Sequence, residues 1–179
     1  MAHLMIIEIA TREDAEAILQ LQRLAYQSEA ELYQDWDIPP LKESLEELLA
    51  EFDRQIFLKA FYADPQCLVG SVRARFQSST CSIGRLIVHP RFQRRGIGSA
   101  LMRQIELHFP QAQRFELFTG HRSSRNLLFY QRLGYVPFRQ QRLSSHVTLV
   151  FLQKPSPNTA LEPTATAPSA VAQKLWRDK

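Results

Sequence analysis

The chain has 179 residues, of which 45% are hydrophobic and 22% charged, and its formal net charge is +4. This composition is typical of one globular domain, and the lack of any apolar run near 18 residues or of a secretion-type start argues against membrane insertion and export. Two cysteines, Cys67 and Cys81, make neither a disulfide framework nor a zinc motif, so we expect a cytoplasmic protein without a metal.

The first half of the chain predicts one strand followed by two helices. Apolar residues in residues 4–10 predict the strand, and Thr11 with Asp14 forms a capping-box pattern for a helix that runs to about Ser28. Residues 33–40 are expected to form a loop that ends in two prolines. Leucines and a phenylalanine at helical spacing then predict a second helix over residues 41–52.

The second half alternates between strands and helices. Three strands are expected before a helix that starts at a Gly-x-Gly segment and stops near Pro110. The predicted strands are 55–63, 67–77, 81–89, 114–119, 135–139 and 147–153, with a further helix over 124–133. Both cysteines fall in strands and are expected to be small buried residues. The order βααβββαβαββ is typical of the α/β class with a mixed sheet.

Residues 155–179 differ in composition, because proline, alanine and threonine replace the larger apolar residues. Such a segment cannot support a core, so we predict one domain over 1–154 and a flexible C-terminal tail over 155–179.

Charge is distributed unevenly along the chain. Residues 1–84 hold 14 acidic and 7 basic side chains, whereas residues 85–142 hold 11 arginines, no lysine and only two carboxylates. The planar guanidinium suits phosphate groups, so this composition favours a phosphate-bearing ligand. Nucleic acid is the alternative partner. It is disfavoured because the arginines are spread over several predicted elements and no recognition helix is evident.

The segment between the strand ending at Val88 and the next helix predicts a phosphate cradle. Glycines at a helix N-terminus expose successive backbone N–H groups, and Arg94 and Arg95 stand beside them. A P-loop would need Lys and Ser/Thr after its second glycine, and a dinucleotide fingerprint would need glycine at Leu101, although Glu116 lies at the spacing of its acidic residue. A third phosphate-cradle pattern, Gln-x-x-Gly-x-Gly, is matched at every fixed position by the segment from Gln93 to Gly98.

A second motif follows downstream, where Asn126 and Tyr130 lie one helical turn apart and Gly134-Tyr135 ends the helix. Together the two motifs resemble those of the GNAT N-acetyltransferase superfamily, most specifically over residues 85–135 and more loosely over 4–154. The resemblance implies the GNAT fold, a central mixed, mostly antiparallel sheet flanked by about four helices. It also implies acetyl-CoA as co-substrate, no metal, and transfer of the acetyl group to a primary amine by direct attack in a ternary complex.

The resemblance assigns roles to individual residues. Backbone groups of the strand before the cradle would hold the pantetheine arm, together with Asn126, and the cradle would hold the pyrophosphate. These cofactor-binding residues are Leu86, Ile87, Val88, Gln93, Arg94, Arg95, Gly96, Ile97, Gly98, Ser99 and Asn126. Tyr130 would return a proton to the leaving thiolate, since phenols ionise near pH 10. Glu116 is the candidate general base, with Glu29 as a second candidate, and His89 is interpreted as structural.

The acceptor pocket is expected to involve the first two helices and the loop between them. Tyr26, Glu29 and Tyr33 mix aromatic rings with carboxylates, which favours a cationic small-molecule amine. Acetylation of a protein N-terminus or lysine stays open, as does a homodimer. The alternatives of other classes are an acyl-CoA-binding module that senses its ligand without turnover and, less favoured, an NAD-dependent dehydrogenase. No nucleic acid or membrane partner is expected.

Overall fold

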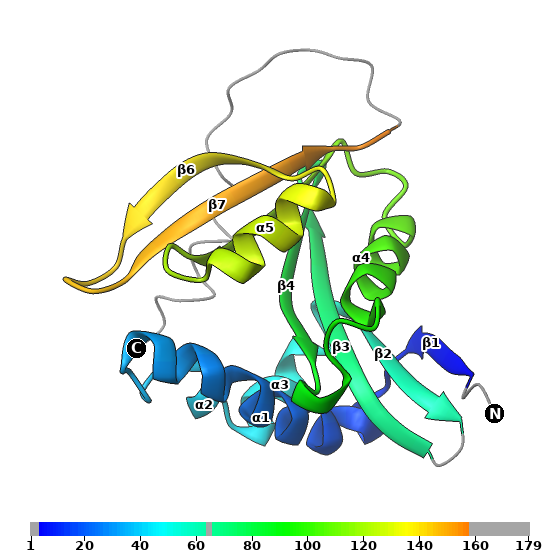
Figure 1. Cartoon of the computed structure of the whole chain (residues 1–179). Coiled ribbons are helices and arrows are strands. Elements are labelled where there is room, and N and C mark those ends of the chain that lie inside the picture. Colours follow the sequence, from blue (N-terminus) through cyan, green and yellow to red (C-terminus); the bar gives the residue numbers. More distant parts are fainter. Residues whose placement is uncertain (1–3, 64–65, 158–179) are drawn as a thin grey trace. The chain divides into compact units, whose positions relative to one another are not determined.

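The computed structural model describes residues 4–63 and 66–157, and Figure 1 shows their arrangement into strands and helices. The strands are β1 (Met5–Ile9), β2 (Ile56–Ala63), β3 (Gln66–Gln77), β4 (Thr80–Val88), β5 (Arg114–Gly120), β6 (Val136–Arg142) and β7 (Thr148–Pro155). The helices are α1 (Ala15–Tyr33), α2 (Pro39–Lys42), α3 (Leu45–Glu51), α4 (Ile97–Leu107) and α5 (Ser124–Arg132), with single 3-10 turns η1 (Arg12–Asp14) and η2 (Pro90–Phe92). Most of the predicted tail lies outside the described residues.

The strands are hydrogen-bonded in the order β1-β2-β3-β4-β5-β7-β6. The pairs β1–β2, β2–β3, β5–β7 and β6–β7 are antiparallel, whereas β4 and β5 are parallel through Thr80 to Ser82 and Arg114 to Glu116. The prediction of a mixed, mostly antiparallel sheet with flanking helices is confirmed. The described residues form two compact units: the first comprises residues up to Arg75 and Gly84–His108, the second Phe76–Ile83 and the residues from Phe109 onward.

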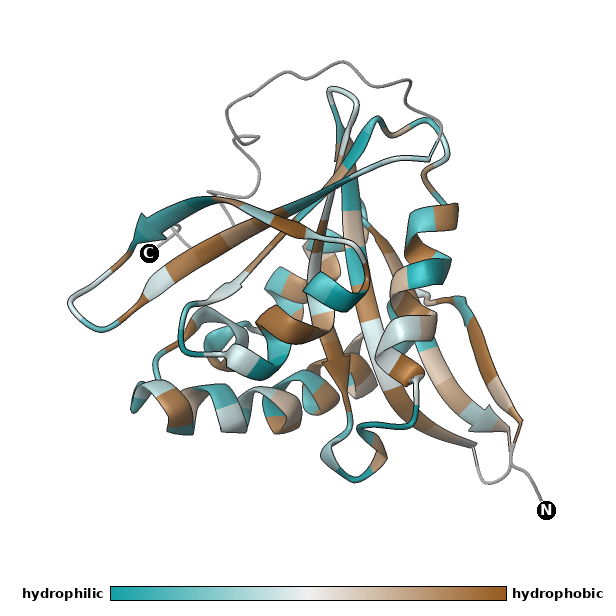
Figure 2. Ribbon diagram, turned by 45° about the horizontal axis from the view of Figure 1, so that its top comes forward, coloured by the Kyte–Doolittle hydropathy of each residue, from teal (hydrophilic) through white to brown (hydrophobic). Residues whose placement is uncertain are grey.

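The core of the first unit lies between α1, α3 and β2. Ile18 and Leu19 of α1, Leu48 of α3 and Phe57 of β2 are each at most 4% exposed and form one apolar cluster. Apolar and polar residues alternate along α1 as a one-sided helix requires, which Figure 2 shows by colour. Ile18 and Leu21 of the apolar stripe that the spacing predicts are buried, but Leu24 of the same stripe is 37% exposed. The spacing therefore identifies the buried side of this helix only in part.

The fourth helix is packed closely against the third strand. A β-carbon placed on Gly70 of β3 would lie 2.9 Å from Cδ1 of Leu101, 3.1 Å from Cγ2 of Ile97 and 3.1 Å from the carbonyl oxygen of Ile87. Only glycine allows this approach, which brings the start of α4 and the end of β4 together over one residue. Figure 1 shows α4 beside β3.

Two helix predictions for the first unit need correction. The first helix extends beyond Ser28 to Tyr33, where Gln34 ends it in a left-handed conformation (φ 51°). The second predicted helix is two helices, because the chain leaves the helical conformation at Glu43 and restarts at Ser44. Ser44 Oγ accepts a hydrogen bond from the Glu47 N–H (3.1 Å), and Glu47 returns one to the Ser44 N–H (2.7 Å).

The second unit is built on a long hairpin of β6 and β7, with α5 beside it in Figure 1. Leu149 and Phe151 of β7 are buried in one apolar cluster of this unit, and Phe118 and Phe138 pack against them at ring distances from Phe151 of 5.5 and 6.5 Å. The apolar colouring of β7 in Figure 2 marks this core. The sixth strand continues to Arg142, three residues beyond the predicted end, because its polar end pairs with β7 as far as Thr148.

Candidate active site

The last residues of β4 lie against the first unit's core. Ile87 is 3% exposed, while Leu86 and Val88 are half-buried, so backbone groups of this strand end reach the surface of the unit. The His89 N–H donates to the Val69 carbonyl (2.8 Å), and its ring Nδ1 accepts from the Arg91 N–H (3.2 Å). Both bonds hold the chain as it leaves the strand, which supports the structural interpretation of His89.

The loop between η2 and α4 has the properties of an anion cradle. Gln93, Arg94, Arg95 and Gly96 are exposed, and Arg94 (φ 61°) and Gly96 (φ 81°) take left-handed conformations. A β-carbon on Gly96 would meet no atom within 4 Å, so the conformation, not lack of space, requires glycine there.

The N-terminus of α4 adds backbone donors to this loop. Gly96 is the N-cap residue and provides no side-chain cap, and the Ala100 N–H is the first to bond within the helix, to the Gly96 carbonyl (2.9 Å). The N–H groups of Ile97, Gly98 and Ser99 therefore have no helical partner. The Arg95 guanidinium lies over the Phe92 ring (5.1 Å to the centroid). The predicted phosphate cradle thus has free helix-terminal N–H groups and exposed arginines in one segment, as an anion site requires.

Asn126 and Tyr130 lie on α5 in the second unit, one turn apart as predicted, and both are half-buried. The Asn126 Nδ2 donates to Thr119 Oγ1 (3.4 Å). The Tyr130 ring meets the edges of Phe129 and Tyr135 at centroid distances of 5.2 and 6.1 Å. These contacts fix the ring orientation of Tyr130, and the left-handed Gly134 (φ 90°) lets the chain turn back under it.

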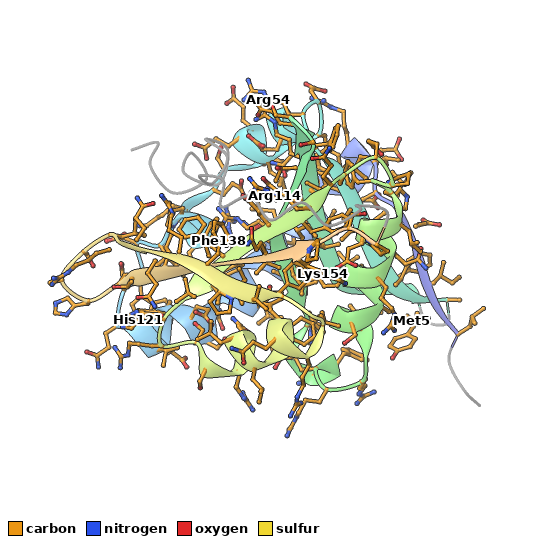
Figure 3. The ribbon with its side chains drawn as sticks, turned by 90° about the horizontal axis from the view of Figure 1, so that it is seen from above. Met5, Arg54, Arg114, His121, Phe138 and Lys154 are labelled. Atoms are coloured by element: carbon orange, nitrogen blue, oxygen red, sulfur yellow. The ribbon has the colours of Figure 1, made fainter. Side chains whose placement is uncertain are left out.

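Glu116 lies on β5 in the second unit, and its side chain has no exposed surface. Its Oε1 pairs with Arg114 Nη2 at 2.8 Å, and Arg114, labelled in Figure 3, also donates from Nε to Thr80 Oγ1 (3.1 Å). A carboxylate that is fully buried and ion-paired is well suited to hold β4 and β5 together. Its predicted role as a base stays a prediction.

The predicted acceptor residues lie along α1 in different environments. Tyr33 is 8% exposed and belongs to the interior, Glu29 is half-buried, and the Tyr26 ring lies under the guanidinium of Arg85 (5.8 Å). The aromatic face expected to meet a cationic ligand is thus already next to a cation of the protein itself. The cationic-acceptor prediction stays untested.

The first unit contains a buried polar cluster that was not predicted from the sequence. Arg73 of β3 is 2% exposed and pairs with Glu43 (Nη2 to Oε1, 3.0 Å), and Gln22 of α1 donates to the same carboxylate (2.7 Å). One sequence pattern points to it: Arg73 interrupts an apolar strand between Val72 and Ala74, both fully buried. An inward arginine in a strand is a sign of an internal partner.

Two further features concern the described residues as a whole. No group of three or more His, Cys, Asp or Glu side chains there is placed to hold a metal ion. No helix of this part of the chain is long and apolar enough to cross a membrane.

The family model that matches this chain and the similar solved structures named below are all of acetyltransferases. The Acetyltransferase (GNAT) family model matches residues 15–135. The UPF0157 protein YqkA of Bacillus subtilis (strain 168) is 30% identical over 121 residues, 68% of this chain, and the chain spans about a third (34%) of that relative's length. Among solved structures, the PaiA N-acetyltransferase of Thermoplasma acidophilum, in complex with coenzyme A, is 19% identical with a TM-score of 0.67. The alignment covers 83% of this chain and 98% of that one.

A second solved structure is YncA of Salmonella typhimurium, described as a putative acetyltransferase with its cofactor acetyl-CoA. It is 16% identical with a TM-score of 0.69, and the alignment covers 91% of this chain and 99% of that one. At these identities the structural matches establish the fold, and the family match covers both sequence motifs.

Proposed function

This chain belongs to the acetyltransferase (GNAT) family, and from that premise we propose that it is an acetyl-CoA-dependent N-acetyltransferase that acts on a primary amine. The observation that carries the proposal is the exposed loop before α4, with left-handed Arg94 and Gly96 and three helix-terminal N–H groups available. PaiA and YncA, which share the fold, were crystallised with coenzyme A and acetyl-CoA.

The residues present fit the chemistry of coenzyme A. Its pyrophosphate is anionic and needs donors at close range, which the amides of Ile97, Gly98 and Ser99 supply, with Arg94 and Arg95 adding charge. Gln93 donates from Nε2 to the Val88 carbonyl (3.5 Å) and so ties the loop to the strand end. Acetyl-CoA supplies an acetyl thioester when bound.

Backbone groups at Leu86, Ile87 and Val88 are proposed to hold the pantetheine arm, with the amide of Asn126 as a further donor. A strand end and a side-chain amide both offer paired donors and acceptors, which suits each of them to the amide groups of a pantetheine arm.

Tyr130 is proposed to hold a proton on Oη for the departing thiolate sulfur. Phenols keep this proton at neutral pH, since their pKa is near 10, and the flanking rings of Phe129 and Tyr135 keep the side chain in one orientation.

The group that takes the amine proton is less well supported. Glu116 is the predicted base, but its buried ion pair with Arg114 favours a structural role. Replacement by glutamine separates the two: a base loses turnover at unchanged thermal stability, whereas a structural carboxylate loses stability first. We measure both for Glu116→Gln and for Glu29→Gln, the second candidate, which has partly exposed surface.

The first test is a thermal-shift comparison of acetyl-CoA, CoA, NAD and a short DNA duplex. A ligand at 100 times its dissociation constant adds about 2.7 kcal/mol of stability, which is a rise of roughly 5–10 °C for a chain of this size. We expect the rise with acetyl-CoA and CoA only. A rise with NAD or DNA alone would contradict the proposal and identify the loop as another kind of phosphate site.

The second test separates an enzyme from a sensing module. Tyr130→Phe should lower kcat for acetyl transfer about 100-fold or more, the usual range for general acids, and leave the CoA-induced shift unchanged. Tyr135→Phe is the matched control, because it removes a neighbouring hydroxyl but keeps the ring packing. An acetyl-CoA-induced shift without thiol release for any amine would instead favour a non-catalytic acyl-CoA-binding module. A cytoplasmic location belongs to the same proposal.

A further inference from the structure

The buried cluster around Arg73 has more hydrogen-bond donors than partners. Arg73 Nη2 donates to Glu43 Oε1, but its Nε and Nη1 are buried and have no hydrogen-bond partner among the described residues. Arg85 Nε is likewise buried and has no hydrogen-bond partner among the described residues. Buried donors in native proteins are nearly always satisfied by protein groups or ordered water, so these three nitrogens are open to an acceptor from outside the described residues.

The cluster contains two guanidinium groups and two carboxylates that act on them. Arg73 and Arg85 act on each other and on the single carboxylate of Glu43, while Glu51, which also attracts Arg73, accepts a hydrogen bond from Gln55. Burial and the charge of Arg85 lower the pKa of Arg73, but guanidinium groups stay protonated in proteins. The two guanidinium groups are therefore balanced by Glu43 and Glu51, and a bound anion would be held by hydrogen bonds to the unpartnered nitrogens, not by an excess of positive charge.

Arg85 connects this cluster to the surface of the first unit. Its side chain is half-buried, in contrast to that of Arg73, and its guanidinium lies over Tyr26 of α1 (5.8 Å). Its backbone has φ of 50°, a left-handed conformation that is unfavourable for an arginine. Strain of this kind persists where function maintains it. Arg85 also directly precedes Leu86, the first residue proposed to hold the pantetheine arm.

We propose that Arg73 and Arg85 bind an anionic group, carboxylate or phosphate, of the acceptor amine. The substrate class is then an amine that carries a negative charge, and Arg85 contacts the anion at the accessible side while Arg73 completes the site from the interior. The assignment to the acceptor rests on the proposed acetyltransferase function. The anion site itself does not, because it follows from the unpartnered donors.

Anion binding is tested directly by NMR on the full-length chain. The guanidinium Nε–H signals are followed during titration with acetate and, separately, with inorganic phosphate, at ionic strength held constant with sodium chloride. We expect the Arg73 and Arg85 signals to shift and saturate before that of Arg54, an exposed arginine after α3 that serves as internal control and is labelled in Figure 3. Shifts no earlier than those of Arg54 for both anions would overturn the anion site.

The link to the acceptor is tested with matched amines in the thiol-release assay. β-Alanine is compared with propylamine, and phosphoethanolamine with ethanolamine, because each pair keeps the primary amine and removes the anion. Putrescine represents a cationic acceptor. We expect a KM at least tenfold lower for one anionic member than for its partner, which corresponds to about 1.4 kcal/mol. Neutral or cationic amines that equal or exceed the anionic ones would overturn the assignment.

Variants complete the test. Arg85→Asn, whose side chain tolerates the left-handed backbone, should abolish the tenfold preference and leave the acetyl-CoA thermal shift unchanged. Arg85→Lys should keep part of the preference, and Arg54→Gln all of it. A preference that survives Arg85→Asn refutes the proposal. If acetyl-CoA produces no thermal shift, the proposed function fails, and the NMR titration still decides whether the anion site exists.

Discussion

Alanine in place of Gly70 is predicted to destabilise the first unit by overpacking. The added β-carbon would lie 2.9 Å from Leu101 Cδ1 and 3.1 Å from both Ile97 Cγ2 and the Ile87 carbonyl oxygen, all closer than ordinary contacts. Leu101 and Ile97 are 0% and 1% exposed, so other atoms surround them, and the carbonyl belongs to the backbone of β4. Relief requires α4 to shift away from β3 and β4, and overpacking of this kind costs about 1–3 kcal/mol.

The cost is measured as a change in melting temperature by circular dichroism. For a chain of this size 1 kcal/mol corresponds to about 2–4 °C, so Gly70→Ala should melt roughly 2–12 °C below the wild type. Gly96 provides a control, because a side chain there would have open space around it. Substitution of Gly96 is unfavourable only because of its left-handed backbone. Asparagine tolerates that backbone better than alanine does, so Gly96→Asn should be milder than Gly96→Ala.

At Gly70 the order of the two substitutions should reverse, because asparagine is larger and the limitation there is space. The reasoning is refuted if Gly70→Ala melts with the wild type, or if Gly70→Asn is the milder variant. A further readout is the thermal shift with CoA. If α4 moves, its terminal N–H groups move with it, and Gly70→Ala should reduce the CoA-induced shift more than an equally destabilising substitution elsewhere does.

Two further predictions concern the link between α2 and α3. Burial raises the pKa of Glu43, but the charges of Arg73 and Arg85 and its hydrogen bonds outweigh burial and hold the pKa below its ordinary 4.5. A lowered pKa stabilises the fold above that value and ceases to do so as the pH falls through the folded value, so Glu43→Gln should cost about 3–5 kcal/mol at pH 7 and less at acid pH. Urea unfolding from pH 7 to 3 measures this, and a constant difference would contradict it. Ser44→Ala removes the N-cap of α3 and should cost about 1 kcal/mol in the same assay, while Ser28→Ala, at an exposed position within α1, should cost less.

The sequence predicts well the elements whose signals are local. The strand, loop and helix around Gly96 follow from one short motif, because glycine, proline and a helical apolar pattern each restrict the backbone directly. The pairing of Thr11 with Asp14 across the start of the first helix is likewise confirmed, with the Thr11 N–H donating to Asp14 Oδ2 at 2.8 Å. These features need no knowledge of the rest of the chain.

The break at Glu43–Ser44 was missed although its signal is present. Ser44 and Glu47 form a capping-box pattern, but the apolar spacing from Leu41 to Phe52 continues across it and favours a single helix. The structure places the carboxylate of Glu43 against Arg73 of β3, 30 residues away. A contact between residues so far apart cannot be inferred from the spacing of residues along one sequence. The sequence alone therefore predicts neither the break in the helix nor the buried cluster that accompanies it.

The break, the buried cluster and the strained arginine have a common physical explanation. A continuous helix would stabilise the fold without the need for Glu43 to turn inward, and an apolar residue at position 73 would avoid the burial of a charge. The left-handed backbone at Arg85 adds a further local cost. The helix break, the buried arginine and the left-handed arginine are each unfavourable for folding, and all three lie in one cluster. Stability of the fold alone does not explain them. A bound anion explains them together, because it would accept from the buried nitrogens of Arg73 and Arg85 that have no partner among the described residues.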